Sequence, residues 1–442
     1  MAGRELTDLF RHPRESVAVL QRRARLSRFR RGRIRRSDTK SESSHFERVV
    51  CDALIGKVRS TDYLAWMSPF VEILAAWHRG DLEHADASAR ALQLLSKRIP
   101  SVVSWQDLLE LSRQLMRVGL FYASLESAKA SWSRLEVDWS SGRRDTFTAL
   151  ARVRALIYQG KPQAARLAID SMLDGRVPAH AQTTLFELDW LTQLIPTHPF
   201  SDRSGESVGC RSDWAESLRN QPVLVYGPGN ATQLPELPNE FLVARIMGPG
   251  VFTWDSPEDL VANRTDIVYS ISANIEKGLS ETGESFRQAI LGYKFLCVKR
   301  GETDELPNAR TVRGFGGLFM SGHPQMMPLS ILDIRWSGAA PVVVGGDFFT
   351  SEVAYRESDR RMVGWADQSQ PLRPQSPSGS DGGDFDRCSL MASHNIFENW
   401  SLIKFLHDSG YVRGDAGFEY AMDYNLAGLA LRYDEILGSQ RL

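Results

Sequence analysis

The 442-residue chain has few cysteines and no long apolar run. Its four cysteines, Cys51, Cys210, Cys297 and Cys388, show no CxxC spacing, so neither a disulfide framework nor a zinc motif is indicated. No stretch of roughly 18 apolar residues occurs, which argues against a membrane-spanning helix. The N-terminus also lacks the apolar core of a signal peptide. Together these absences predict a protein of a reducing compartment, most simply the cytoplasm.

Net charge is also small, at -1, but it is unevenly distributed: residues 1–40 carry 12 Arg and one Lys against four acidic residues, a net charge of +9. The Arg-rich run QRRARLSRFRRGRIRR is interrupted by Leu26, Phe29 and Ile34. Such a run suits a solvated tail, an anionic lipid surface or nucleic acid. Because no nucleic-acid-binding fold follows, we interpret residues 1–45 as a flexible basic arm. Its candidate partner is an anionic membrane surface, and we expect no nucleic-acid partner.

Residues 46–195 have helical periodicity and one recurring pattern. An apolar helix, a short turn and an Ala-rich helix recur, with Gly80, Gly119 and Gly160 in turns spaced by 39 and 41 residues. Glycine ends helices because it accepts positive φ. The near-constant period predicts three helical hairpin repeats. They resemble tetratricopeptide-type repeats, although they are longer and lack the full consensus. We expect them either to bind a protein partner or to cover one side of the next domain.

The character of the chain changes after residues 196–221, which are rich in Pro, Ser and Gly and predict a linker. From there to the C-terminus, β-branched runs alternate with helical patterns, which predicts a mainly parallel sheet. The expected strands are residues 223–226, 240–247, 265–272, 293–300 and 340–347. The predicted fold class is therefore α plus α/β: helical hairpin repeats, then a Rossmann-like α/β domain over residues 222–442.

Glycine or asparagine residues lie at the ends of three of these strands. Gly227, Gly229 and Asn230 follow the first, Asn274 follows the third and Gly345 ends the last. Turns at the carboxyl edge of a parallel sheet bind ligands, and glycine lets backbone N–H groups approach a phosphate. These residues are therefore candidate nucleotide contacts, although each also suits an ordinary structural turn.

A Ser-Gly turn, a helical pattern and a strand follow one another in LFMSGHPQMMPLSILDIRWSGAAPVVVGGDFF, residues 318–349. This order resembles the small sialylmotif of sialyltransferases and of bacterial transferases that use CMP-Kdo. VLVYGPGN resembles the start of that family's large motif, and ASHNIFENWSLIKFLHDSG resembles its last motif. The resemblance covers roughly residues 222–410 and implies that Ser321 and Gly322 hold the CMP phosphate at a helix N-terminus, where free N–H groups favour an anion.

The resemblance also implies roles for two histidines. His394 would be the general base, and His323 would contact the donor's phosphate or carboxylate. Histidine suits a base because its ordinary pKa lies near working pH. His394 also suits a capping position ahead of a helix, and Glu398 fits a capping box with Asn395 as N-cap. Because His394 and Glu398 are one residue closer than in vertebrate members of the family, the role of Glu398 stays open.

The resemblance therefore implies an inverting glycosyltransferase that moves Kdo or sialic acid from a CMP donor to a glycan or lipid-linked acceptor in surface-polysaccharide synthesis. We expect no metal or other cofactor, and a cytoplasmic location, peripheral on the inner membrane. One alternative is a metal-dependent nucleotide-diphosphosugar transferase, in which Asp384 and Asp386 of a DxD triplet hold Mg²⁺ or Mn²⁺. Another is a non-catalytic helical-repeat scaffold with a degenerate nucleotide-binding domain.

Overall fold

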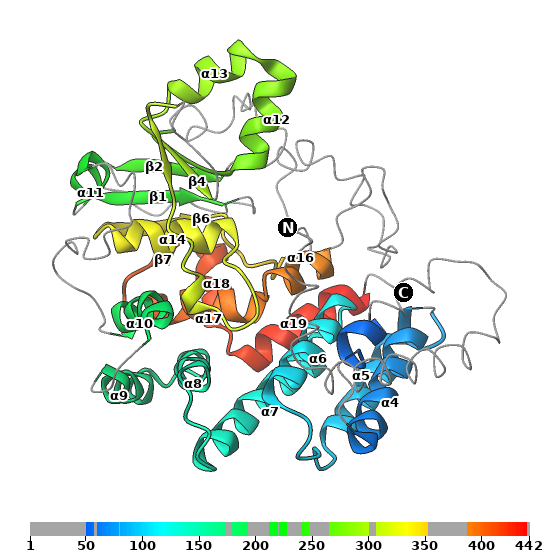
Figure 1. Ribbon diagram of the computed structural model, residues 1–442. Coiled ribbons are helices and arrows are strands. Elements are labelled where there is room, and N and C mark those ends of the chain that lie inside the picture. The colour runs from blue at the N-terminus through cyan, green and yellow to red at the C-terminus, as the bar shows by residue number, and fades with distance from the viewer. Residues whose placement is uncertain are drawn as a thin grey trace, which may run out of the picture.

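The protein combines helices with one parallel sheet (Figure 1). The computed structural model describes residues 50–56, 60–78, 80–173, 178–192, 212–219, 221–227, 241–246, 265–299, 306–351 and 387–439. The predicted basic arm, most of the predicted linker, Gly229, Asn230, Asp384 and Asp386 lie outside these ranges. Within them the fold is mostly helical with a seven-stranded, all-parallel sheet, which confirms the α plus α/β class.

The N-terminal helices follow one another along the chain with short connections between them. The elements are α4 (Thr61–His78), α5 (His84–Leu95), α6 (Trp105–Arg117), α7 (Phe121–Ser140), α8 (Thr146–Tyr158), α9 (Pro162–Leu173) and α10 (Ala179–Thr192). Gly80, Gly119 and Gly160 lie in the turns between α4 and α5, between α6 and α7, and between α8 and α9, with φ of 79°, 80° and 68°. Because only glycine adopts this region readily, these three turns were predictable from sequence.

The sheet has the strand order β5-β4-β3-β2-β1-β6-β7. Its strands are β1 (Pro222–Tyr226), β2 (Leu242–Ile246), β3 (Ile267–Ile271), β4 (Phe295–Lys299), β5 (Ala309–Thr311), β6 (Ala340–Val344) and β7 (Arg413–Gly414). The chain builds from β1 to β5 in one direction and then crosses to β6 on the other side of β1. The strand order therefore reverses between β1 and β6. The five predicted strands are present, while the short β5 and β7 were not predicted.

Helices cover both faces of the sheet. Figure 1 shows α12 (Ser272–Thr282) and α13 (Glu284–Leu291) on one side of the strands and α14 (Met326–Trp336) on the other, where the N-terminal helices also lie. The side chains of the strands alternate accordingly. Val225 and Val343 join the core on the α14 side, while Val268, Leu296 and Val298 pack with Phe286 of α13.

Part of the predicted linker belongs to this core. Residues 212–218 form α11 (Ser212–Leu218), and its Trp214 is fully buried. The Trp214 ring lies 4.1 Å from the Arg310 guanidinium, and its Nε1 donates to Ser337 Oγ at 2.7 Å. An aromatic residue inside a stretch rich in Ser and Gly was the signal that this segment packs rather than merely connects.

The last helices of the chain join the N-terminal helices α4 to α10, called the helical part below, to the sheet. They are α16 (Arg387–Ser393), α17 (Ile396–Asp408), α18 (Ala416–Asp423) and α19 (Leu426–Ser439). Asp434 of α19 accepts hydrogen bonds from the backbone N–H groups of Phe121 and Tyr122, at 2.8 and 3.1 Å. It thereby caps α7, whose own N-cap residue makes no side-chain cap bond. The Phe121 ring also contacts Tyr433 and Phe397, so the two parts share a core.

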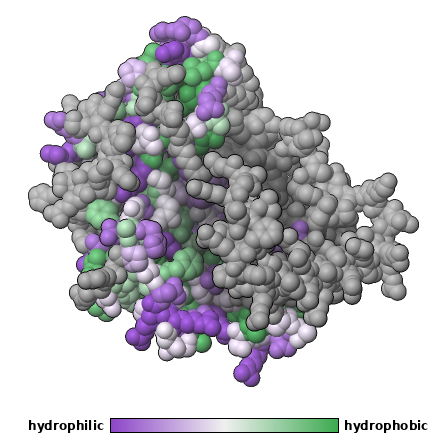
Figure 2. All heavy atoms as spheres, in the orientation of Figure 1, coloured by the Kyte–Doolittle hydropathy of each residue, from purple (hydrophilic) through white to green (hydrophobic). Residues whose placement is uncertain are grey.

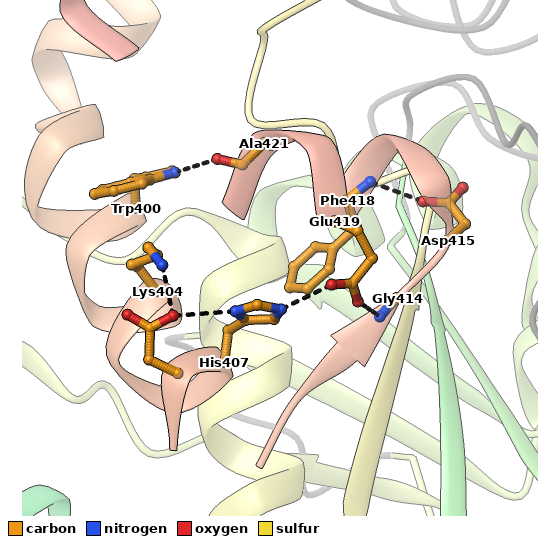
Figure 3. Close-up of polar contacts among 9 residues, drawn as sticks. Trp400, Lys404, His407, Gly414, Asp415, Phe418, Glu419 and Ala421 are labelled. Atoms are coloured by element: carbon orange, nitrogen blue, oxygen red, sulfur yellow. Dashed lines mark hydrogen bonds and ion pairs between the residues drawn. The ribbon is translucent and has the colours of Figure 1, made fainter. Parts of the chain in front are cut away.

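Figure 3 shows how α17 is fixed against β7 and α18. His407 Nε2 lies 2.7 Å from Glu419 Oε2, and the other oxygen of Glu419 accepts from Gly414 N–H at 2.7 Å. Trp400 Nε1 donates to the Ala421 carbonyl at 2.9 Å. These contacts hold α17 at Trp400 and at His407, so its N-terminal end has a defined position relative to the sheet.

The outer surface is mixed in character. Figure 2 shows hydrophilic residues gathered towards the lower edge of one face, over the helical part, with smaller groups of exposed hydrophobic residues elsewhere. Among the described residues no helix is long and apolar enough to cross a membrane.

Candidate functional site

The candidate site lies at the carboxyl edge of the sheet, where the strand order reverses. Gly227 follows β1, and its N–H donates to the Val344 carbonyl of β6 at 2.7 Å. A Cβ on Gly227 would lie 2.6 Å from the Gly345 carbonyl oxygen. Gly345 has a φ of 66°, and its N–H donates to Asp415 Oδ2 at 3.0 Å. Both glycines therefore allow a close approach of the two strand ends, and both N–H groups are engaged inside the protein.

The N-terminus of α14 lies at the same edge. This helix connects β5 to the parallel strand β6, so it runs opposite to the strands and starts at their carboxyl ends. Its Met327 sulfur would be 3.2 Å from a Cβ on Gly227. The helix begins with Gln325 as N-cap, four residues after Ser321. Ligands of open α/β sheets bind where the strand order reverses, and a helix N-terminus there carries partial positive charge.

The Ser321–Gly322 turn is held against α17 rather than turned to solvent. Ser321 Oγ donates to Glu398 Oε1 at 3.0 Å, and its backbone N–H contacts Glu398 Oε2 at 3.4 Å. A Cβ on Gly322 would lie 2.6 Å from the His394 carbonyl oxygen. Glycine is thus required here because the turn passes directly over the segment that carries His394.

The two predicted histidines meet through one hydrogen bond. His394 Nδ1 lies 3.3 Å from the His323 carbonyl oxygen. A carbonyl only accepts, so we assign the proton to Nδ1, which leaves the lone pair on Nε2. Within the described part of the chain no hydrogen bond or ion pair engages Nε2. Burial lowers the pKa of His394 to about 4, with a smaller contribution from Lys299, so the ring is neutral near pH 7.

Asn399 holds both histidine segments together. Its Oδ1 accepts from the Gln325 N–H at 2.9 Å, and its Nδ2 donates to the His323 carbonyl at 3.3 Å and to the His394 carbonyl. The sequence analysis did not single out Asn399. The available signal was its spacing from Asn395, because residues four apart share one face of a helix.

Lys299 is a second residue that the sequence analysis missed. It is the last residue of β4, after four buried positions, and its Nζ donates to the Pro324 carbonyl at 2.6 Å. A lysine, two histidines and a helix N-terminus therefore lie at one edge of the sheet. A lysine that directly follows a buried strand was the signal, because the strand's carboxyl end places it at that edge.

Glu398 is buried, with 4% of its surface exposed. Its carboxylate accepts from Met320 N–H at 3.0 Å and from Asn395 Nδ2 at 2.8 Å, in addition to Ser321. Asn395 Oδ1 accepts from the Glu398 N–H at 3.3 Å, which confirms Asn395 as N-cap. The reciprocal half of the predicted capping box is replaced by contacts to the loop. Burial raises the pKa of Glu398, and the hydrogen bonds from Ser321 and Met320 oppose this.

The remaining predicted residues are less closely connected to this edge. Asn274 is the third residue of α12, at the end of β3, and β2 separates that strand from β1. Gly229, Asn230, Asp384 and Asp386 lie outside the described residues. Among the residues that are described, no group of three or more His, Cys, Asp or Glu side chains suits a metal ion. Cys297 is buried, which raises the pKa of its thiol to about 12.

The site therefore offers a neutral imidazole whose Nε2 makes no hydrogen bond to the described residues, an ammonium group and a helix N-terminus at a reversal of strand order. Such an arrangement can accept a proton beside a bound anion. Comparison with known proteins found no matching family model, no similar curated protein and no similar solved structure.

Proposed function

We propose that the protein is an inverting glycosyltransferase that moves Kdo or a sialic acid from a CMP donor to a glycan or lipid-linked acceptor. One observation carries the proposal. The segments around Ser321 and His394, chosen by their resemblance to sialylmotifs, are 71 residues apart at the His394–His323 contact and meet at the carboxyl edge. In this proposal the sheet is a Rossmann-like nucleotide-binding fold, and α4 to α9 are tetratricopeptide-like hairpins.

The proposed chemistry is a single displacement. His394 Nε2 takes the proton of an acceptor hydroxyl, the hydroxyl oxygen attacks the anomeric carbon, and the bond to the CMP phosphate oxygen breaks. Lys299 and the N-terminus of α14 stabilise the leaving phosphate, and His323 contacts the phosphate or the sugar carboxylate. The negative donor also favours the protonated imidazole, so donor binding raises the pKa of His394 towards the working pH.

The proposed setting follows from the acceptor. Lipid-linked acceptors lie at the inner membrane, so we propose a cytoplasmic enzyme that is peripheral on that membrane. The Arg-rich arm would contact anionic lipid there.

The test is calorimetric titration with CMP, using lysines at opposite ends of β4. We expect CMP to bind the wild-type protein and Lys299→Met to weaken binding about tenfold or more, since a charge-assisted hydrogen bond contributes roughly 1.5–3 kcal/mol. Lys294→Met is the matched control, because Lys294 precedes the strand and lies over the Phe295 ring. Equal weakening by both variants would contradict the proposed place of the phosphate.

Two further outcomes would replace the proposal. Binding of UDP only in the presence of Mn²⁺ would favour the metal-dependent alternative that uses Asp384 and Asp386. No binding of either nucleotide would favour the non-catalytic scaffold. If CMP binds, His394→Ala should abolish transfer from CMP-Kdo and CMP-sialic acid while CMP binding persists. Transfer at the wild-type rate by that variant would remove His394 as the base.

A further inference from the structure

The loop between β5 and α14, residues 312–325, carries the Ser321–Gly322 turn and His323 yet has little regular structure. It contains one short 3₁₀ helix, η1 (Gly316–Leu318), and Phe315 just before it has a φ of 47°. A residue with a side chain adopts this left-handed region at a cost in free energy. Such a conformation persists only where its surroundings hold it, so the contacts of the loop matter for the site.

Three side chains of the helical part contact this loop. Arg154 of α8 donates from Nε to the Gly317 carbonyl at 2.6 Å, and Tyr158, one turn further on, donates its hydroxyl to the Leu318 carbonyl. Glu187 of α10 accepts from the Gly317 N–H at 3.0 Å and from Arg313 Nε at 3.3 Å. Side chains of the helical part therefore satisfy backbone groups of the loop that no strand or helix could satisfy.

These side chains are buried and carry opposite charges. Arg154 is 9% exposed and Glu187 is 3% exposed. Burial lowers the pKa of Arg154 and raises that of Glu187, and each charge opposes the shift of the other. Arg154 also interacts electrostatically with Glu398, which lies on α17 at the other side of the loop. The loop thus lies between Arg154 and Glu187 of the helical part on one side and Glu398 of α17 on the other.

The contacts of the helical part lie only a few loop residues away from the hydrogen bond of His394, the proposed base. Tyr158 holds Leu318, Glu398 holds Met320 and Ser321, and the His323 carbonyl accepts from His394 Nδ1. Only six consecutive loop residues, 318–323, separate the hydroxyl of Tyr158 from the hydrogen bond of His394. A displacement of the loop at Leu318 therefore reaches the imidazole with little intervening flexible chain.

We propose that Arg154, Tyr158 and Glu187 are positioning residues for the His323–His394 pair. The helical part would then fix the conformation of the loop that forms one side of the donor site. The sequence left open whether the helices form a protein-binding platform or a cover. The inference assigns them to the site itself. Its binding readout rests on the proposed CMP site, whereas its spectroscopic readout at His394 does not.

The first experiment compares two buried tyrosines of the helical part. Tyr158→Phe removes the hydroxyl that holds Leu318, and Tyr63→Phe removes a hydroxyl that donates to the Leu54 carbonyl at 2.7 Å, away from the loop. Each variant removes one buried tyrosine hydroxyl and leaves the ring in place, so a loss of thermal stability is expected in both. We expect only Tyr158→Phe to weaken CMP binding, by about tenfold, the equivalent of one buried hydrogen bond.

The same pair of variants is examined by NMR titration of the histidine rings. In wild-type protein and in Tyr63→Phe the pKa of His394 should stay near its value of about 4. In Tyr158→Phe it should rise towards the ordinary value of roughly 6.5, because a loosened loop admits water to the ring. A His394 pKa and a CMP affinity both unchanged in Tyr158→Phe would overturn the proposal.

A second pair guards against a special effect of one tyrosine. Arg154→Met removes the contact to Gly317, and Arg152→Met, on the same helix, removes a surface ion pair with Glu136 at 2.9 Å. Arg154→Met should change His394 as Tyr158→Phe does, and Arg152→Met should not. If wild-type protein binds no CMP but the His394 pKa still separates the variants from their controls, the proposed function fails while the positioning role stands. Equal effects of both arginine variants would overturn the positioning role.

Discussion

Two clusters of mostly buried charged and tyrosine side chains use their charges differently. The ion-pair cluster comprises Arg310, Asp333 and Tyr269, with Arg310 and Asp333 joined at 2.6 and 3.1 Å and the Tyr269 hydroxyl donating to Asp333 at 2.8 Å. The Asp333 carboxylate is satisfied by the other two side chains, while Arg310 Nε has no hydrogen-bond partner among the described residues. The loop cluster comprises Arg154, Tyr158, Glu187, Arg313 and Glu398, and its members mainly satisfy backbone groups of the loop before α14.

In the ion-pair cluster the charged groups pair with each other, whereas in the loop cluster they hydrogen-bond to backbone groups of the loop. A self-contained pair compensates its own desolvation and leaves neighbouring backbone unaffected. Charges that are directed at backbone N–H and carbonyl groups let a chain segment without helix or strand stay buried in one conformation. The second kind is what a functional loop needs, and the His323–His394 pair lies at the end of that loop.

The largest effect is expected in the ion-pair cluster. Asp333→Leu leaves the Arg310 guanidinium buried without its carboxylate, which should lower the free energy of unfolding by about 3–5 kcal/mol. The double variant Arg310→Met, Asp333→Leu should recover much of this loss, since no unpaired charge remains. Urea denaturation followed by tryptophan fluorescence measures both. A double variant no more stable than the single one would show that the pair does more than compensate itself.

Glu398→Gln should have a smaller effect on stability and a larger effect on function. The amide nitrogen would face N–H donors from the loop, so one buried hydrogen-bonding group is left unsatisfied, at a cost of about 1–3 kcal/mol. CMP affinity in calorimetry should fall with it. Glu136→Gln is the control, because Glu136 is 40% exposed and pairs with Arg152 on the surface. Unchanged CMP affinity in Glu398→Gln would mean that the loop does not need this anchor.

Two glycines of the same loop differ in the space available to a side chain. Gly322→Ala places a Cβ 2.6 Å from the His394 carbonyl, while around Gly314 a Cβ would meet nothing within 4 Å. We expect Gly322→Ala to cost about 1–3 kcal/mol through the forced shift, and Gly314→Ala to stay within about 0.5 kcal/mol of wild type. Thermal unfolding and CMP titration of both variants provide the measurement. Similar behaviour of the two would contradict the close contact between the turn and His394.

The pH dependence of stability should report the burial of His394. An unfolded chain protonates His394 near pH 6.5, while the folded protein does so only at about 4. Between these values the unfolded state binds more protons, so the contribution of His394 to stability falls as pH drops from about 6.5 to about 4. His394→Gln should flatten the fall in this range. A wild-type profile that His394→Gln leaves unaltered would indicate an ordinary histidine.

What the sequence could predict follows from how local each signal is. The five predicted strands are short, mostly buried runs with clear β-branched patterns, whereas β7 has only two residues and no period to detect. Asn395 as N-cap was readable because its partner is three residues away. The contacts of Arg154 and Asn399 could not be read in this way, because their partners are 163 and 74 residues distant. Contacts at such separations exist only once the helices and the sheet have packed.

We propose that a nucleotide phosphate binds beside His394, and NMR titration of His394 with and without CMP detects such binding. In free protein the ring should titrate with a pKa of about 4. Bound CMP should shift the ring signals and raise that pKa, because a nearby negative charge favours the imidazolium. Ring signals and a pKa that remain unchanged at saturating CMP would contradict the account.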